Sequence, residues 1–363
     1  MMESPTEIVT SLPTLTQAAT VGPSETPFPS QTPSPQPTAT PDYKTIAAIG
    51  QITTYEVSQL RQKLQEMFQQ LGGLADIIRP GARVTIKPNL TGTTWSDATL
   101  PAPTTELFVT HPMLVQALAE LLIDAGAGQI RIVEGLGDEA IFRAWGYEDV
   151  ASRINAELVD LCKPAPYGDF ATFPVGNGRQ IYDVFYMNGV LKEVDVFISL
   201  AKMKCHSTTG VTLSLKNLIG LPPISLYRRD EGQNHRSAFH ESTAYDQRLP
   251  RVAIDLNLAR PVHLALVDGI KTVEGGAGVW DTGYNPIQPG LIIAGKNPVV
   301  TDAVSTALMG FDPDAPSGSN PFSYADNHLL LAREAGLGTN RLQEIGVLGA
   351  NVADTVFPFK TAR

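Results

Sequence analysis

Two hydrophobic patterns alternate along the chain, one typical of buried strands and the other of amphipathic helices. The first apolar run, at residues 45–52, predicts a strand. The apolar residues of 55–71 follow at helical spacing, which predicts a helix that begins after Thr54 as its cap. Two glycines, Gly72 and Gly73, end this helix.

The same two patterns continue to the end of the chain. Further strands are predicted at 83–86, 129–133, 158–161, 181–186, 194–200, 263–267, 291–294 and 345–348. Further helices are predicted from Pro112 onward and at 139–145, 148–155, 211–219, 252–258, 298–309 and 328–335. The polar stretch 222–250 has little periodicity and is predicted to be a long loop of functional importance.

Strands that alternate with helices are typical of an α/β fold. The sequence therefore predicts a largely parallel or mixed sheet flanked by helices over residues 43–363. The pattern leaves open whether these elements form one body or two lobes with a cleft between them.

A different composition precedes this domain. Residues 1–42 hold nine Pro, nine Thr and five Ser, and such a segment is expected to form a disordered leader or stalk. It contains no apolar run of the kind found in a signal peptide. Because similar stalks follow the export signal or lipid anchor of bacterial surface proteins, we expect an extracytoplasmic or surface-tethered protein. A disordered cytoplasmic tail is the alternative.

Composition narrows the classes of partner. The formal net charge of −10 and the pI of about 5.1 argue against a nucleic-acid partner. No apolar run reaches the roughly 18 residues of a transmembrane helix. Cys162 and Cys205 are too few for a disulfide scaffold, and whether they are bridged to each other stays open. The sequence does not indicate an oligomeric state.

Polar side chains gather where the predicted strands end. In open α/β sheets, ligands bind beyond the carboxyl ends of the strands, so these positions are candidates for ligand contact. The residues concerned are Lys87, Asn89, Glu134, Lys202, Lys204, His206, Lys216, Asn217 and Asp268.

The 202–217 segment carries the largest share of this chemistry. Its three lysines would neutralise a carboxylate or phosphate, and His206 could serve as acid, base or metal ligand near neutral pH. The Ser207–Gly210 turn precedes a predicted helix whose first amides favour an anion. Solvated lysines and a plain helix cap are the alternative interpretation. Glu134 and Asp268 would either bind a metal, orient a histidine or lysine, or cap helices.

Other histidines lie outside this segment. His111 begins a predicted helix from which it could reach the strand ends. His235 lies on the long loop beside Arg228, Arg229 and Arg236, where it could complete a site on loop closure. An ordinary surface or loop position explains either histidine equally well.

Several short motifs follow one another along the chain. They are Lys87-Pro88-Asn89, His111-Pro112, Lys202-Met-Lys-Cys-His206, Gly210-Val-Thr212, Lys216-Asn217-Leu-Ile-Gly220, Asp268-Gly269, Glu274-Gly275 and Asp302-Ala303. In this order they resemble the motifs of the domain-of-unknown-function 362 family, and the resemblance covers residues 87–338. Many members of that family carry a ferredoxin-like cysteine cluster. This chain lacks those cysteines, so no iron–sulfur cluster is expected from it alone.

The chain is also distantly similar to the nickel-dependent lactate racemase group, in which a histidine is followed ten positions later by a lysine. His206 and Lys216 have this spacing. The resemblance implies His111 and His206 as acid and base partners, Lys216 as the residue that holds an organic nickel cofactor, and His235 as a metal contact. A divalent transition metal bound by His206 and His235 is therefore among the expectations.

Three functions remain open from the sequence. The first is an enzyme-like pocket that binds a small anionic ligand or metal cofactor, with isomerase-like or racemase-like proton transfer. The second is a non-catalytic extracytoplasmic protein that binds an anion or metal with the same residues. The third is a partner of a separate redox protein.

Overall fold

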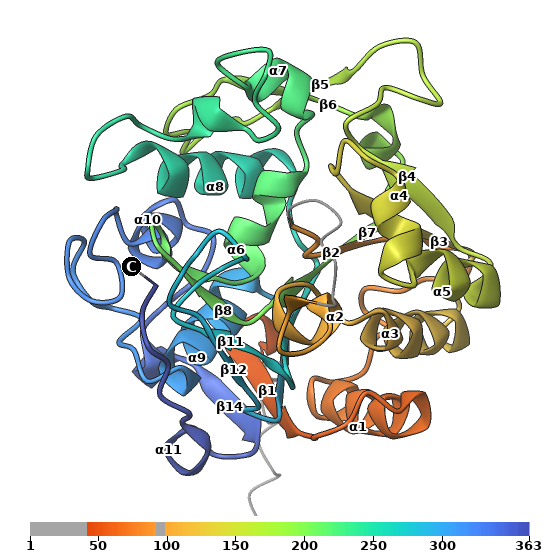
Figure 1. Cartoon of the computed structure of the whole chain (residues 1–363). Coiled ribbons are helices and arrows are strands. Elements are labelled where there is room, and N and C mark those ends of the chain that lie inside the picture. The colour runs from red at the N-terminus through yellow and green to blue at the C-terminus, as the bar shows by residue number, and fades with distance from the viewer. Residues whose placement is uncertain (1–41, 92–98, 363) are drawn as a thin grey trace, which may run out of the picture. The chain divides into compact units, whose positions relative to one another are not determined.

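The computed structural model describes residues 42–91 and 99–362, and its centre is an eight-stranded sheet (Figure 1). From one edge to the other the strands are β14 (Gly346–Gly349), β1 (Ile46–Gln51), β13 (Leu291–Gly295), β10 (Leu264–Gly269), β7 (Val196–Lys202), β2 (Arg83–Pro88), β3 (Gln129–Glu134) and β4 (Glu157–Asp160).

Most neighbouring strands of this sheet run parallel. β13 is antiparallel to both β1 and β10, while the other neighbours pair in parallel. The expectation of a largely parallel or mixed sheet is therefore confirmed. As a consequence, the carboxyl ends of β10, β7, β2, β3 and β4 all lie at the same edge.

Helices cover both faces of the sheet (Figure 1). One face carries α1 (Val57–Gln70), α3 (Pro112–Asp124) and α5 (Tyr147–Ile154), and the other carries α6 (Ser214–Asn217), α8 (Arg248–Ala259), α9 (Pro298–Leu308) and α10 (His328–Glu334). Strand side chains alternate between the two layers. Ile198 and Leu200 therefore pack with the first layer, and Phe197 packs toward the second.

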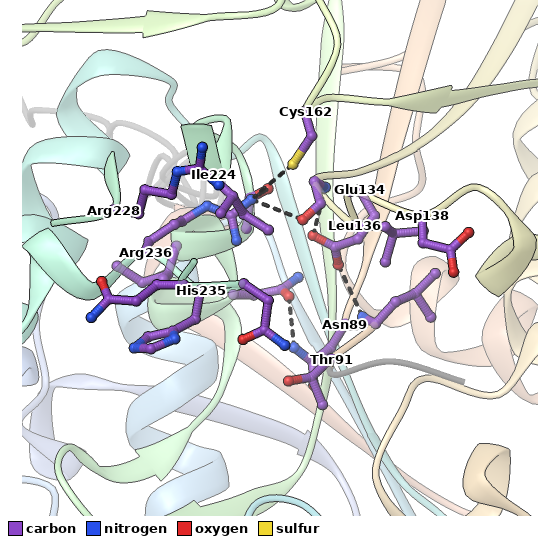
Figure 2. Close-up of a pocket in the computed structure, with 18 of the residues that line it drawn as sticks. Asn89, Thr91, Glu134, Leu136, Asp138, Cys162, Ile224, Arg228, His235 and Arg236 are labelled. Atoms are coloured by element: carbon purple, nitrogen blue, oxygen red, sulfur yellow. Dashed lines mark hydrogen bonds between the residues drawn. The ribbon is translucent and has the colours of Figure 1, made fainter. Parts of the chain in front are cut away.

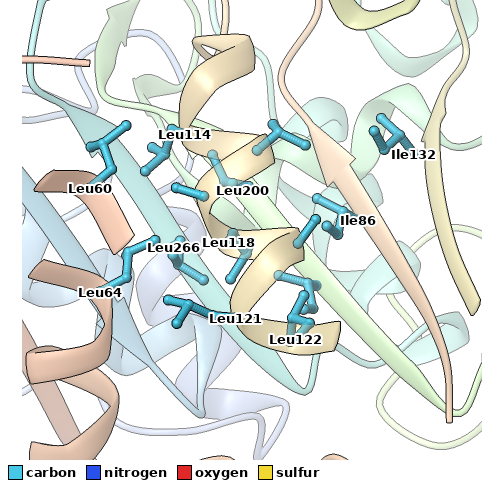
Figure 3. Close-up of a cluster of buried hydrophobic side chains, with 14 of the residues drawn as sticks. Leu60, Leu64, Ile86, Leu114, Leu118, Leu121, Leu122, Ile132, Leu200 and Leu266 are labelled. Carbon is cyan, nitrogen blue, oxygen red and sulfur yellow. The ribbon is translucent and has the colours of Figure 1, made fainter. Parts of the chain in front are cut away.

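The core under α3 shows why this helix forms where its pattern predicts. Pro112 occupies the first turn, and the His111 ring nitrogen Nδ1 accepts the Met113 amide as a cap. Leucines along one side of α3 then face Leu200 and Leu266 of the central strands (Figure 3). Burial of this apolar stripe, more than intrinsic helix propensity, stabilises the helix.

Smaller elements complete the described fold. They are the helices α2 (Thr104–Leu107), α4 (Ala140–Ala144), α7 (Ile224–Tyr227) and α11 (Val352–Thr355), and the strand pairs β5 (Ala171–Pro174) with β6 (Val184–Met187), β8 (Lys204–His206) with β9 (Gly210–Thr212), and β11 (Thr272–Glu274) with β12 (Asn285–Ile287).

The helix predicted over 211–219 is wrong in its extent. Gly210 has a φ of 73°, which turns the chain into the β8–β9 hairpin, and Leu213 is extended. The α-helical part is therefore limited to α6, with a 3-10 turn at Leu218–Gly220 after it. Apolar periodicity over nine residues did not distinguish a short strand followed by one helical turn from a continuous helix.

Other boundaries also differ from the predictions. α1 is capped by Glu56, whose side chain accepts the Gln59 amide, and not by Thr54. The strand predicted at 181–186 is shifted to β6. The predicted long loop 222–250 contains α7, a 3-10 turn at Ser237–Phe239 and the start of α8.

Residues 42–363 form one compact unit instead of two lobes. The predicted leader falls on residues 1–41, which lie outside the described residues, and so it stays a prediction. Among the described helices, none combines the length and apolar character needed to span a bilayer. Cys162 and Cys205 are both free thiols.

The α3 packing leads to a stability prediction. Leu118→Ala should lower the free energy of unfolding by about 2–5 kcal/mol, because Leu118 is fully buried against the sheet and a cavity would remain. Ile123→Ala on the same helix is the control, since Ile123 is 41% exposed and should change stability by less than about 1 kcal/mol. Urea denaturation of both variants tests the assignment of faces, and equal losses would contradict it.

Candidate functional site

A cavity of about 1190 Å³ opens beyond the carboxyl ends of β2 and β3. Side chains from the 224–240 segment form one wall, opposite residues that follow β2 and β3 (Figure 2). The polar lining residues include Lys87, Asn89, Glu134, Asp160, Cys162, Lys163, His206, Lys216, Asn217, Arg228, His235 and Arg236. Val279 and Trp280 add an apolar wall that the sequence analysis did not identify.

A buried ion pair forms the floor of the cavity. The Lys87 ammonium donates to Glu134 Oε2 at 2.7 Å, and both side chains are at most 2% exposed. Glu134 also accepts the amides of Leu90 and Gly135. Burial lowers the pKa of Lys87, and the Glu134 carboxylate opposes that shift. Each charge is therefore compensated inside the protein, as burial of an ion pair requires.

Gly220 makes this close packing possible. A Cβ at position 220 would lie 2.1 Å from Glu134 Oε1 and 2.8 Å from the Lys87 ammonium, so any side chain there would displace the ion pair. Asn217, one helical turn earlier, accepts from Lys87 Nζ and donates to the Lys87 carbonyl. The segment after α6 is therefore fixed to the end of β2.

Lys216 lies on α6 next to this floor. Unlike the ammonium of Lys87, its ammonium is not paired with Glu134. Both carboxylate oxygens of buried Asp302 accept amides at the start of α6, from Ser214 and Leu215, each at 2.8 Å. The helix is thus anchored, yet Lys216 Nζ has no hydrogen-bond or ion-pair partner among the described residues. Burial and the nearby Lys87 charge lower the pKa of Lys216 to about 8.

His206 ends β8 and has a defined tautomer in its neutral form. Its Nδ1 atom accepts the backbone amides of Thr208 at 3.1 Å and Thr209 at 3.3 Å. Burial, followed by the charge of Lys216, holds the pKa of His206 well below its usual value. The neutral ring must therefore carry its proton on Nε2, which makes His206 a hydrogen-bond donor.

Four other residues predicted for the site lie outside the cavity lining. Lys202 Nζ and Asp268 form a fully buried ion pair at 3.1 Å, and the Tyr55 hydroxyl donates to the same carboxylate at 2.9 Å. The His111 amide also donates to Asp268, and the His111 ring stacks on Tyr55 at 3.7 Å. Burial lowers the pKa of His111 to about 4, so the ring is neutral near pH 7.

Lys204 is the fourth of these residues. Its ammonium donates to the carbonyls of Phe108 at 2.7 Å and Ala277 at 2.9 Å, and it is 2% exposed. Burial, together with the charges of Lys216 and Lys202, holds its pKa well below the usual value. These contacts give Lys204 a role in joining the 108 and 277 segments.

The opposite wall contains two arginines, Arg236 and Arg228, with different surroundings. Arg236 donates to the carbonyls of Gly135 at 2.9 Å and Gly220 at 3.1 Å, and its Nη2 lies 4.0 Å from the Cys162 sulfur (Figure 2). Arg228 lines the same wall, and its guanidinium has no partner among the described residues. The loop therefore supplies one structural arginine and one that is available to a ligand.

The donor set expected for a metal is not assembled. In the part of the chain that the structure describes, no group of three or more His, Cys, Asp or Glu side chains is placed to hold a metal ion. His206 Nδ1 is occupied by two amides, and His235 is exposed. Because the residues do not fit a nickel or other transition-metal centre, no chemical step is assigned to one.

Comparison with known proteins agrees with the motif order. The family model described as "Domain of unknown function (DUF362)" matches residues 84–307. The chain belongs to the DUF362 family. The match includes the cavity floor, His206 and Lys216, so the resemblance seen in the sequence is confirmed.

Individual relatives of this DUF362 protein are distant. A curated protein named thylakoid-associated protein sll1697, from Synechocystis, is 25% identical over 268 residues, which cover 72% of this chain and 73% of that protein. Two solved structures have a TM-score of 0.35. One is a Thermotoga maritima protein, which is 10% identical and for which the match covers 64% of this chain and 53% of that chain. The other is the lactate racemase apoprotein of Thermoanaerobacterium thermosaccharolyticum, which is 11% identical and for which the match covers 69% of this chain and 55% of that chain. The chain thus spans about half the length of each structure.

The ion pair of the floor can be tested by a double-mutant cycle. Lys87→Met should lower the free energy of unfolding by about 3–5 kcal/mol, because it leaves the Glu134 carboxylate buried without its counter-charge. Adding Glu134→Gln, which keeps an acceptor for the two amides, should recover part of that loss. Additive losses in urea denaturation would show that the two charges are not coupled.

The environment of Lys216 predicts unusual reactivity. Trace acetylation followed by peptide mass spectrometry should show Lys216 reacting with a midpoint near pH 8, since only the neutral amine reacts. Lys163 is the control, because its ion pair with Glu139 raises its pKa and its reactivity should increase only at higher pH. Identical pH profiles for the two lysines would rule out the desolvated position of Lys216.

Proposed function

We propose that the cavity binds a small carboxylate and transfers a proton at the carbon next to it. The observation that carries this proposal is the position of Lys216, an amine without a partner among the described residues, in the wall of a cavity that it shares with His206. A cation held away from any carboxylate is suited to an anionic ligand. A lowered pKa suits the same group to proton transfer near neutral pH.

Arg228 supplies the second part of the proposed site. Its guanidinium lines the cavity without a partner among the described residues, and its planar fork can bind a carboxylate through two hydrogen bonds. Arg228 would then hold the carboxylate of the ligand. Lys216 would be left free to exchange its proton with the neighbouring carbon.

His206 would stabilise the negative charge that develops in this step. When the C–H bond breaks, the proton moves to Lys216 Nζ and the electron pair is delocalised onto an oxygen of the ligand. The Nε2–H of neutral His206 can donate to that oxygen. Hydrogen-bond donors placed where charge develops typically contribute about a hundredfold or more to the rate.

Proton exchange in D₂O tests this function directly. The purified protein should exchange the proton next to the carboxylate of glycolate or lactate, as followed by NMR. His206→Gln should slow exchange about a hundredfold while binding is retained. Arg228→Met should weaken binding about tenfold or more. Lys163→Met is the matched control, since Lys163 lines the same cavity but is paired with Glu139.

The outcomes also separate the competing functions. Carboxylates that bind, depend on Arg228 and yet show no exchange would identify a non-catalytic binding protein. Absence of binding by any small carboxylate would reject the anion site altogether. Exchange that survives His206→Gln unchanged would remove His206 from the mechanism.

A further inference from the structure

We propose that Lys216 is also a nucleophile, and that it forms a covalent imine with the carbonyl carbon of a 2-oxo acid. This inference rests on the proposed function, because it places the carboxylate of the ligand in the same cavity. It names a narrower class of substrate, small carboxylates that carry an aldehyde or ketone next to the acid group.

The first support is the contrast between Lys216 and the other lysines of this region. Lys87 donates to Glu134, Asn217 and the Pro88 carbonyl, so its nitrogen has no lone pair to offer. Lys163 is paired with Glu139 at 2.8 Å. Lys202 and Lys204 do not line the cavity. Among the described lysines in the cavity wall, Lys216 is therefore the one whose nitrogen is unengaged.

The second support is that the backbone around Lys216 is anchored and that its amine has no carboxylate partner among the described residues. Asp302 accepts the amides of Ser214 and Leu215 at 2.8 Å, two positions and one position before Lys216. After burial, the charge that lowers the pKa of Lys216 is that of Lys87, and Lys216 in turn lowers the pKa values of Lys204, His206 and His328. A desolvated lysine next to other cationic groups is the environment in which amines act as nucleophiles at neutral pH.

The chemistry balances without any further reagent. The lone pair of Lys216 Nζ forms a bond to the carbonyl carbon, and the π pair of the carbonyl moves onto its oxygen. His206 Nε2–H can donate to that oxygen while the charge develops. The two protons of the amine then leave with the oxygen as water, and the C=N bond forms. Arg228 would hold the acid group and so orient the carbonyl toward Lys216.

Reductive trapping tests this proposal on the intact chain. Glyoxylate with cyanoborohydride should add one reduced glyoxylate per protein, and peptide mapping should place it on Lys216. Propionaldehyde, which has the same carbonyl without a carboxylate, should label Lys216 about tenfold less. Arg228→Met should remove this preference.

Two variants act as matched controls. Lys216→Arg keeps the positive charge but cannot form an imine, so the adduct should disappear. Lys163→Arg should leave labelling unchanged. The melting temperature of each variant shows whether it is folded, and mapping of the wild-type protein does not depend on any variant. Labelling spread over surface lysines without preference for Lys216 would overturn the proposal.

The result also separates this inference from the proposed function. If glyoxylate raises the melting temperature in an Arg228-dependent way but no adduct forms, imine formation is rejected and the anion site stands. If glyoxylate neither stabilises the protein nor forms an adduct, both proposals fail.

Discussion

Two buried ion pairs join the carboxyl ends of four adjacent strands, and the arrangement of the whole region depends on them. Lys87 and Glu134 connect β2 to β3, and Lys202 and Asp268 connect β7 to β10. Because each charge would be costly to bury alone, the strands must be in register before either pair can form. The first pair becomes the floor of a cavity, while the second is enclosed by Tyr55 and the start of α3.

Much of the fold could be predicted because the central strands of the sheet are buried on both faces. β7 is one continuous buried run that ends at a polar side chain. Such runs are typical of parallel strands in an α/β sheet. The strand ends could therefore be found from the sequence. The rule that ligands bind at those ends then indicated Lys87, Glu134 and His206, which do line one cavity.

The sequence could not predict which strand-end residues line the cavity and which are enclosed by the protein. This outcome depends on partners that are far apart in the sequence. Lys202 and Lys216 could not be distinguished in the sequence. Lys202 forms an ion pair with Asp268, whereas Lys216 has no partner among the described residues. The tautomer of His206 likewise depends on two amides placed by a tight hairpin. The sequence predicted a turn at Ser207–Gly210 but a helix at 211–219 in place of β9, so it indicated neither the hairpin nor the proton position.

The pairing of β1 has a consequence for how the chain acquires this structure during synthesis. β1 lies near the amino-terminal end of the described residues, but both of its neighbours, β13 and β14, come from the last quarter of the chain. During synthesis, the apolar β1 segment therefore cannot pair with its neighbours until almost all of the protein has left the ribosome. Until then its backbone groups lack their final strand partners, which exposes the segment to pairing with other chains.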